Sequence, residues 1–234
     1  MQEWVLLLYR GVQDESCVLG TGVVGHSLAS KLVSLGHEVM MGSRTKDNEK
    51  GAEWVSSMGE RAHQGDFADT TAFGELLINC TSGLHSLAVL EAAGASSLKG
   101  KILLDVSNPL DFSNGFPPSL SVCNTTSLAE QIQEAYPETK VVKTFNTLSH
   151  EVMIDPGRVP GEHDLFISGN DVEAKAEVCK LLREGFGWQS IIDLGDITTA
   201  RGTEAYLLLW TRLWGVLGTS DFNIKIVKRE KEST

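Results

Sequence analysis

The stretch Cys17-Val18-Leu19-Gly20-Thr21-Gly22-Val23-Val24-Gly25 (CVLGTGVVG) decides the fold. Its glycines match G-x-G-x-x-G, a pattern that follows a strand and opens a helix in dinucleotide-binding βαβ units. Gly20 permits a tight turn, Gly22 lets backbone N–H groups approach a pyrophosphate, and Gly25 allows close packing of helix on strand. The N-terminus of the helix adds partial positive charge for the phosphates. We therefore predict a pyrophosphate site made of Gly20, Thr21, Gly22, Val23, Val24 and Gly25.

The residues after this turn complete a βαβ unit. Apolar residues recur at helical spacing at Val24, Leu28, Leu32 and Leu35. Gly36 stands where a left-handed cap would end that helix, and residues 38–41 are predicted as the second strand.

Short apolar runs alternate with longer helical patterns along the chain, which is typical of a parallel sheet with crossover helices. After strands at 17–19 and 38–41, further strands are predicted at 76–79, 101–106, 141–145, 165–167 and 190–194. Asn170-Asp171 is predicted to cap the helix before the last of these. The fold class is therefore α/β, a Rossmann-type doubly wound parallel sheet with a C-terminal helical portion.

Three segments lie outside this regular pattern. Asp14-Glu15-Ser16 leaves only residues 17–19 as the apolar approach to the turn, so residues 1–15 form an atypical N-terminal segment. Residues 147–163, which contain Asp155-Pro156-Gly157, are predicted as a long irregular loop at a mobile edge or a domain junction. We place the nucleotide-binding domain at 16–195 and a C-terminal portion at 196–234, with a long helix at about 199–217 and a terminal strand at 222–227.

A basic cluster follows the second strand in Val39-Met40-Met41-Gly42-Ser43-Arg44-Thr45-Lys46 (VMMGSRTK). NAD enzymes carry an acidic residue at this position, which accepts hydrogen bonds from the ribose 2′-OH and would repel a 2′-phosphate. Here no Asp or Glu stands between Val39 and Asp47. Guanidinium, hydroxyl and ammonium groups suit a phosphate instead. We predict that Ser43, Arg44, Thr45 and Lys46 bind the 2′-phosphate of NADP(H), the alternative being an ordinary solvated basic loop.

Composition narrows the classes of partner. The 234 residues are 41% hydrophobic and 22% charged, enough for one sizeable core, and the net charge of −11 argues against nucleic acid or an anionic membrane surface. Four scattered cysteines without a C-x-x-C pair indicate reduced thiols in the cytoplasm rather than a disulfide or zinc framework. The most apolar C-terminal stretch, 205–218, contains Arg212 and is shorter than the roughly 20 residues of a membrane span. We expect a soluble cytoplasmic protein with no metal site.

The chain resembles the coenzyme F420-dependent NADP oxidoreductase family, which includes the cytosolic reductase domain of eukaryotic transmembrane metalloreductases. The resemblance rests on blocks in the family's order: VLGTGVVG at 18–25, LGHEVMMGSR at 35–44, KILLDVSNP at 101–109, VVKTFN at 141–146, SGNDVEAKA at 168–176 and NIKIV at 223–227. It implies an NADP(H)-binding domain and a second redox cofactor, either the deazaflavin F420 or a flavin (FMN or FAD). It also implies that the C-terminal portion forms a homodimer and leaves a cleft for that second cofactor.

The resemblance also assigns residues by position. It gives the pyrophosphate to residues 21–24 and the 2′-phosphate to Ser43 and Arg44. Thr81, Ser82 and Leu84 would lie against the adenosine side or the phosphates, and Asn108, Pro109 and Asn146 would approach the nicotinamide.

The chemistry expected from the residues agrees with such a reductase. Hydride transfer between two rings needs contact geometry and exclusion of water rather than a nucleophile. The sequence has neither G-x-S-x-G nor H-E-x-x-H, and we assign no catalytic residue. We predict hydride transfer between NADP(H) and a small-molecule redox cofactor. Two alternatives stay open: an NADP(H)-binding sensor without turnover, and an NADP-dependent dehydrogenase of a small organic substrate, which would need a buried acid or base.

Overall fold

A computed structural model describes residues 15–229 of the protein. Its strands are β1 (Glu15–Leu19), β2 (Glu38–Ser43), β3 (Ala62–Asp66), β4 (Leu76–Asn79), β5 (Ile102–Asp105), β6 (Leu110–Asp111), β7 (Ser119–Leu120), β8 (Lys140–Thr144), β9 (Asp164–Gly169) and β10 (Ser190–Gly195). The predicted atypical segment 1–15 lies outside the described residues, except for Glu15, which begins β1.

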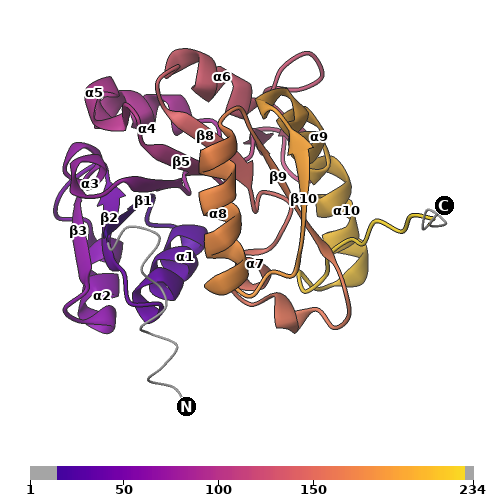
Figure 1. The fold of residues 1–234 in the computed structure, drawn as a ribbon, viewed down its shortest axis with the longest axis horizontal. Helices are drawn as coiled ribbons and strands as arrows, with labels where there is room; N and C mark the ends of the chain where they lie inside the picture. The colour runs from indigo at the N-terminus through magenta and orange to yellow at the C-terminus, as the bar shows by residue number, and fades with distance from the viewer. Residues whose placement is uncertain (1–14, 230–234) are drawn as a thin grey trace.

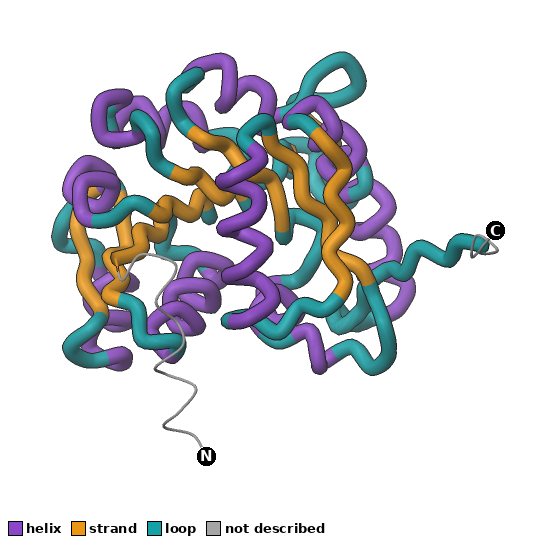
Figure 2. The backbone as a smooth tube through the Cα atoms, in the orientation of Figure 1, coloured by secondary structure: helices purple, strands orange, loops and turns teal. Residues whose placement is uncertain are grey.

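The helices cover both faces of one central sheet (Figures 1 and 2). They are α1 (Val23–Ser34), α2 (Glu49–Met58), α3 (Phe67–Phe73), α4 (Ser86–Ala93), α5 (Ala95–Leu98), α6 (Leu128–Ala135), α7 (His150–Ile154), α8 (Val172–Glu184), α9 (Ala200–Ala205) and α10 (Leu207–Leu217), with 3-10 turns η1 (Pro156–Arg158) and η2 (Ile197–Thr199). Side chains alternate along a strand, so Val18 enters the core beneath α1 and α8 while Cys17 and Leu19 enter the core beneath α4 and α6.

The sheet has the order β10-β9-β8-β5-β4-β1-β2-β3. Every neighbouring pair is parallel except β8 and β9, so the predicted doubly wound parallel sheet is confirmed with one antiparallel pair. The chain runs outward from β1 through β2 and β3, and then returns to the other side of β1 at β4. This reversal creates a switch point at the carboxyl ends of β1 and β4, where ligands of open α/β sheets bind.

The first crossover follows the predicted local signals. Gly36 has φ +99°, and the His37 N–H donates to Leu32 O, as in a left-handed helix end. At the other predicted cap, the Asp171 carboxylate accepts from the Ala174 N–H at 2.8 Å and begins α8. Asn170 instead accepts from the Ile197 N–H through its side chain.

Several expectations were wrong. The strand β3 was missed because its sequence, AHQGD, is largely polar at an edge of the sheet. Residues 147–163 are not irregular throughout, because Val152 and Met153 bury one side of α7 and the His150 ring bonds Ser27 of α1. The helix predicted at 199–217 is divided by a turn at Tyr206, whose carbonyl accepts from both Leu209 and Trp210.

The predicted terminal strand at 222–227 is also wrong, since no strand is assigned between residues 218 and 229. This segment does run beside the start of β9, where the Asp164 N–H donates to Ile224 O at 2.9 Å. The next bond comes from the Ile226 N–H to the Asp164 side chain at 2.6 Å. A carboxylate thus takes the place of the backbone carbonyl that would continue a strand ladder.

Candidate functional site

The glycine turn lies at the switch point and has the geometry that its pattern predicts. Gly20 has φ +116° and its N–H donates to Gly42 O at 2.9 Å. A Cβ on Gly25 would lie 2.1 Å from Gly20 O, so only glycine lets α1 begin this close to β1. A Cβ on Gly22 would meet no atom within 4 Å, which leaves the tip of the turn open. Gly22 begins α1 without a side-chain cap or an acidic residue in the first turn, so the helix amides face an open surface.

The basic cluster occupies the last residue of β2 and the loop after it, and its four residues differ in their surroundings. Ser43 is only 6% exposed, and its hydroxyl donates to Thr45 O and accepts from the Thr45 N–H. Arg44 is exposed and has no hydrogen bond or ion pair with any residue in 15–229. Lys46 is paired with Asp69 at 2.6 Å and lies 3.7 Å from Asp66. Arg44 is therefore the cation left available at this loop within the described chain.

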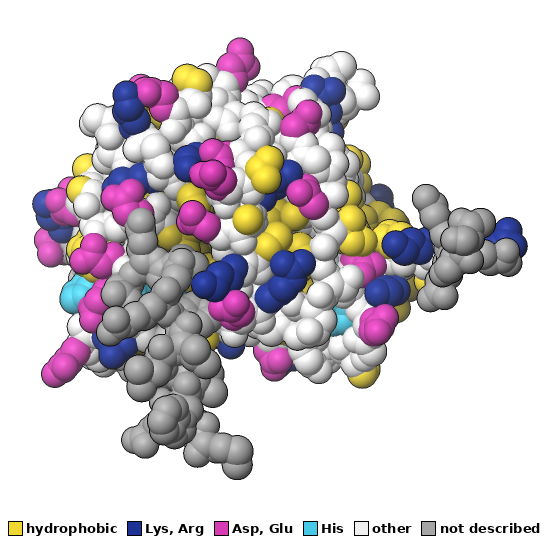
Figure 3. All heavy atoms as spheres, viewed as in Figure 1, with side chains coloured by type: hydrophobic (Ala, Val, Ile, Leu, Met, Phe, Trp, Pro, Cys, Tyr) yellow, Lys and Arg dark blue, Asp and Glu magenta, His cyan; other side chains and the backbone are white. Residues whose placement is uncertain are grey.

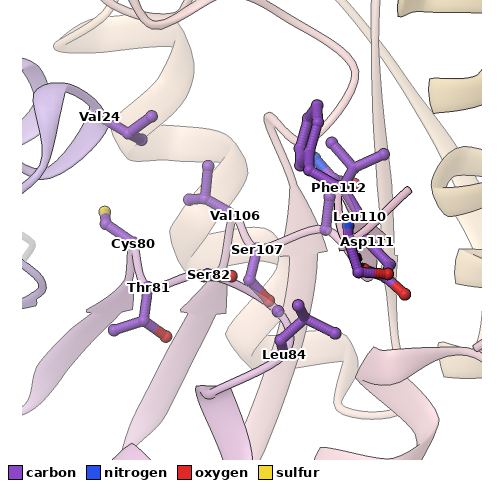
Figure 4. A pocket seen from close by; sticks show the side chains of 13 residues that line it. Val24, Cys80, Thr81, Ser82, Leu84, Val106, Ser107, Leu110, Asp111 and Phe112 are labelled. Atoms are coloured by element: carbon purple, nitrogen blue, oxygen red, sulfur yellow. Dashed lines mark hydrogen bonds between the residues drawn. The ribbon is translucent and has the colours of Figure 1, made fainter. Parts of the chain in front are cut away.

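A pocket of about 610 Å³ lies beside the turn at the carboxyl edge of the sheet (Figure 4). Five predicted site residues line it, namely Val24, Thr81, Ser82, Leu84 and Asn108. The others that line it are Cys80, Gly83, Val106, Ser107, Leu110, Asp111, Phe112 and Ser113. Figure 4 shows Leu110, Asp111 and Phe112 on the side opposite Cys80 and Thr81, so the pocket is closed on one side by strand ends and on the other by the hairpin β6–β7.

The remaining predicted residues lie around this pocket rather than in its lining. Thr21, Gly22 and Val23 form the turn at the N-terminus of α1, and residues 43–46 stand at the end of β2. Pro109 and Asn146 are buried behind the lining. The Asn146 side chain donates to Asn108 Oδ1 at 2.9 Å, and the Asn108 side chain donates to Asn146 O at 2.8 Å. Asn108 thus faces the pocket while Asn146 holds it.

Two further features distinguish this edge of the sheet. Phe145, which is buried, has φ +65°, a left-handed conformation that costs a non-glycine residue energy and is often found at functional sites. Burial raises the pKa of the Cys80 thiol, and Asp105 raises it further. Cys80 therefore contributes a neutral thiol to the pocket wall rather than a nucleophilic thiolate.

Sequence reasoning missed the buried charges beneath the pocket. Lys143 is 1% exposed and its ammonium lies 2.8 Å from Asp105 Oδ2 and 2.9 Å from Glu204 Oε1. The sequence does place a lysine inside the apolar run VVKTF and an aspartate inside the apolar run ILLDV. A charge in a buried strand requires a buried partner, so these two residues could have indicated a buried ion pair.

Residues 15–229 contain no group of His, Cys, Asp and Glu arranged to hold a metal ion. Within the same range, none of the helices combines the length and apolar character needed to cross a membrane. The four cysteines, all in this range, are free.

Comparisons with known proteins agree on one family. The family model described as NADP oxidoreductase, coenzyme F420-dependent, matches residues 16–109. An F420-dependent NADP reductase of Methanocaldococcus jannaschii is 30% identical over 194 residues, which cover 80% of this chain and 85% of that protein. The crystal structure of a candidate F420-dependent NADP reductase from Arthrobacter sp. FB24 is 51% identical, with a TM-score of 0.86 over 92% of this chain and 99% of that one.

A second group of relatives is longer. Metalloreductase STEAP3 of Rattus norvegicus is 31% identical over 202 residues, covering 85% of this chain. The chain spans only 37% of the length of that metalloreductase.

Proposed function

The chain belongs to the F420-dependent NADP oxidoreductase family, and on that premise we propose that it transfers hydride between NADP(H) and a second redox cofactor, the deazaflavin F420 or a flavin. The observation that carries the proposal is the unpaired Arg44 at the end of β2, beside a glycine turn that is open at its tip. A cation without an intramolecular partner in the described chain is suited to the 2′-phosphate that distinguishes NADP(H) from NAD(H).

The residues assign a role to each part of the edge. In this proposal, residues 20–25 hold the pyrophosphate on the N-terminus of α1, where amides and helix dipole favour an anion. Arg44 and Thr45 face the 2′-phosphate, while Ser43 shapes the loop through its bonds to Thr45. Lys46 reaches the phosphate only if it leaves Asp69.

The pocket would hold the nicotinamide end and the ring of the second cofactor. Thr81, Ser82 and Asn108 supply polar groups, and Leu84 and Phe112 supply apolar surface that excludes water. When bound, NADPH supplies a hydride with its electron pair, which reduces the acceptor ring and leaves NADP⁺. The protein's task is positioning, which agrees with a lining that has a neutral thiol and no paired acid and base.

Titration of the protein with NADPH and NADH tests the first half of this proposal. We expect clearly tighter binding of NADPH, and loss of that preference in Arg44→Ala. Equal affinity of the unaltered protein for both nucleotides would contradict the assignment of NADP(H).

Stopped-flow mixing of the NADPH-loaded protein with F420, FMN and FAD tests the second half. Loss of NADPH absorbance with at least one acceptor is expected. Tight NADPH binding without transfer to any of the three would instead favour a nucleotide sensor.

We also propose that the protein is a homodimer through α10. Leu208, Leu209, Trp214, Val216 and Leu217 of this helix are exposed, and Val216 is 85% exposed. Figure 3 shows hydrophobic side chains gathered on the right of that view, where α10 lies. Apolar patches of this kind mark interfaces. Sedimentation should give a dimer that Trp214→Glu converts to a monomer, and a monomeric parent protein would refute this.

A further inference from the structure

Three polar side chains form a row across neighbouring strands beneath the pocket. Asn79 of β4 is in register with Asp105 of β5, and Asp105 is in register with Lys143 of β8. The Asn79 amide donates to Asp105 Oδ1 at 2.9 Å, and Lys143 Nζ donates to Asp105 Oδ2 at 2.8 Å. All three are at most 1% exposed, so the row is part of the protein interior.

Each member of the row also holds one of the loops that line the pocket. Asn79 Oδ1 accepts from the Thr81 hydroxyl at 2.6 Å and from the Thr81 N–H at 3.2 Å. Asp105 Oδ1 accepts from the Ser107 hydroxyl at 2.7 Å and from its N–H at 3.2 Å. Lys143 Nζ donates to Ser107 O at 2.6 Å. Ser107 is therefore fixed at its N–H by Asp105 and at its C=O by Lys143.

Fixing Ser107 also fixes the polar group beside it. Asn108 follows directly and is paired with Asn146 in the loop after β8. On its other side, a Cβ on Gly83 would lie 2.1 Å from Asn108 O, so the loop after β4 packs directly against it. The three loops are locked together, and the row beneath them sets where Asn108 points.

The far end of the row connects to the C-terminal portion. Glu204 of α9 accepts from Lys143 through Oε1, and it also accepts the Leu128 N–H at 2.7 Å and the Ala129 N–H at 3.1 Å, which begin α6. Burial lowers the pKa of Lys143, but Asp105 and Glu204 outweigh that effect and leave the pKa raised, so the ammonium stays charged.

Stability does not explain such an arrangement, because well-packed apolar side chains in place of a buried ion pair are often as stable. The charged groups instead fix the orientation of the loops they bond, since each hydrogen bond has a defined donor, acceptor and angle. We propose that Lys143 is a positioning residue for hydride transfer, which holds Ser107 and so Asn108 against the nicotinamide end of NADP(H). This inference rests on the proposed function.

The test compares Lys143→Met with Lys175→Met. Lys175 is a matched control because it is also buried, at 8% exposure, and its Nζ bonds Asp193 at 2.8 Å and Gly195 O at 3.0 Å near the β10 edge of the sheet. For each protein, NADPH affinity, the fluorescence lifetime of bound NADPH and the single-turnover rate with F420 or FMN are measured. The lifetime reports how firmly the nicotinamide is held and needs no acceptor.

For Lys143→Met we expect an NADPH Kd within about threefold of the parent, a shortened lifetime, and a transfer rate lowered roughly 10- to 100-fold, the loss typical of a small misplacement. Lys175→Met should change neither lifetime nor rate. If Lys143→Met does not fold, Lys143→Met with Glu204→Gln removes one stranded charge and takes its place in the assay.

A folded Lys143 variant with the parent's lifetime and rate would overturn the inference. Equal losses in the Lys175 variant would overturn it as well, because they would show a general effect of stability. A parent protein that fails to bind NADPH would instead refute the proposed function, so the two failures are distinguishable.

Discussion

The two ends of the candidate site are built in opposite ways. At the proposed phosphate end, residues 44–46 form an exposed loop in which Arg44 is unpaired within the described chain and Lys46 has surface partners. At the proposed nicotinamide end, the loops that carry Thr81 and Ser107 are fixed by buried polar side chains on the strands below, Asn79 and Asp105. The first arrangement suits recognition, where an exposed cation can adjust to its ligand. The second suits positioning, where hydride transfer tolerates little movement.

The comparison predicts its largest effect for Asp105→Leu. This change leaves the Lys143 ammonium with Glu204 and Ser107 O, leaves the Asn79 amide with Ser86, and removes the acceptor of the Ser107 N–H. Removing one partner of a buried ion pair costs about 3–5 kcal/mol, or roughly 6–20 °C in Tm for a chain of this size. Thermal unfolding followed by circular dichroism measures this change in Tm.

The control is Asp69→Leu at the phosphate end, which should leave Tm unchanged because the pair of Asp69 with Lys46 is exposed. A similar decrease in Tm in both variants would show that the two ends do not differ in their contribution to stability.

At the phosphate end the largest effect is expected on binding, not on stability. Arg44→Ala should raise the Kd for NADPH about 10- to 100-fold, because it removes charge-assisted bonds to the 2′-phosphate. The Kd for NADH and the Tm should stay at the parent values. Lys46→Ala is the matched control, and its smaller effect would follow from the pairing of Lys46 with Asp69. Calorimetric titration measures the NADPH affinity of both variants. A larger loss of affinity in Lys46→Ala than in Arg44→Ala would mean that Lys46 leaves Asp69 when the nucleotide binds.

The same contrast explains what the sequence could predict. The glycine turn and the basic loop lie within residues 17–46, so their spacing alone indicates a strand, a helix and a phosphate site. The alternation of apolar runs likewise predicted the Rossmann-type sheet, which the structure confirms. The local sequence pattern gave wrong predictions at the edges of the sheet. It missed β3, which is polar, and it predicted a strand at 222–227, where the Asp164 carboxylate accepts a backbone hydrogen bond that a strand ladder would otherwise take.

The nicotinamide end could not be predicted in this way. Asp105 and Lys143 are 38 residues apart and come together only through the register of β5 with β8. Glu204 joins them from α9, which follows two further strands, β9 and β10, in the sequence. A charged residue in an apolar strand indicates that a buried partner exists, but the strand order is needed to identify it.

A smaller effect is expected for Asp69→Asn, which sharpens the account of the phosphate end. The hydrogen bond from Lys46 lowers the pKa of Asp69, and without that carboxylate the Lys46 ammonium keeps only the more distant Asp66, at 3.7 Å, and can turn toward the nucleotide. NADPH should bind a few-fold tighter, most clearly at low salt, because exposed charges are screened over about 10 Å at 0.1 M. Asp69→Asn combined with Lys46→Ala should cancel the gain. An improvement that survives the double change would show that Asp69 acts on the phosphate directly.

The smallest effect concerns acid sensitivity at the nicotinamide end. Glu130 of α6 accepts from Arg201 of α9 at 2.8 Å, which holds together the two helices that meet at Glu204. The Arg201 hydrogen bond is the main cause that lowers the pKa of Glu130. A lowered pKa in the folded state means that the stabilisation is complete above the ordinary pKa of a glutamate in the unfolded chain and is lost as the pH falls through the folded value. Glu130→Gln should therefore lower the free energy of unfolding by up to about 1 kcal/mol at pH 7 and leave it unchanged at acid pH, where the parent has lost the same pair.

Because α9 carries Glu204, acid should shorten the fluorescence lifetime of bound NADPH in the parent before it weakens NADPH binding. Loss of both at the same pH would mean that the two ends are not independent.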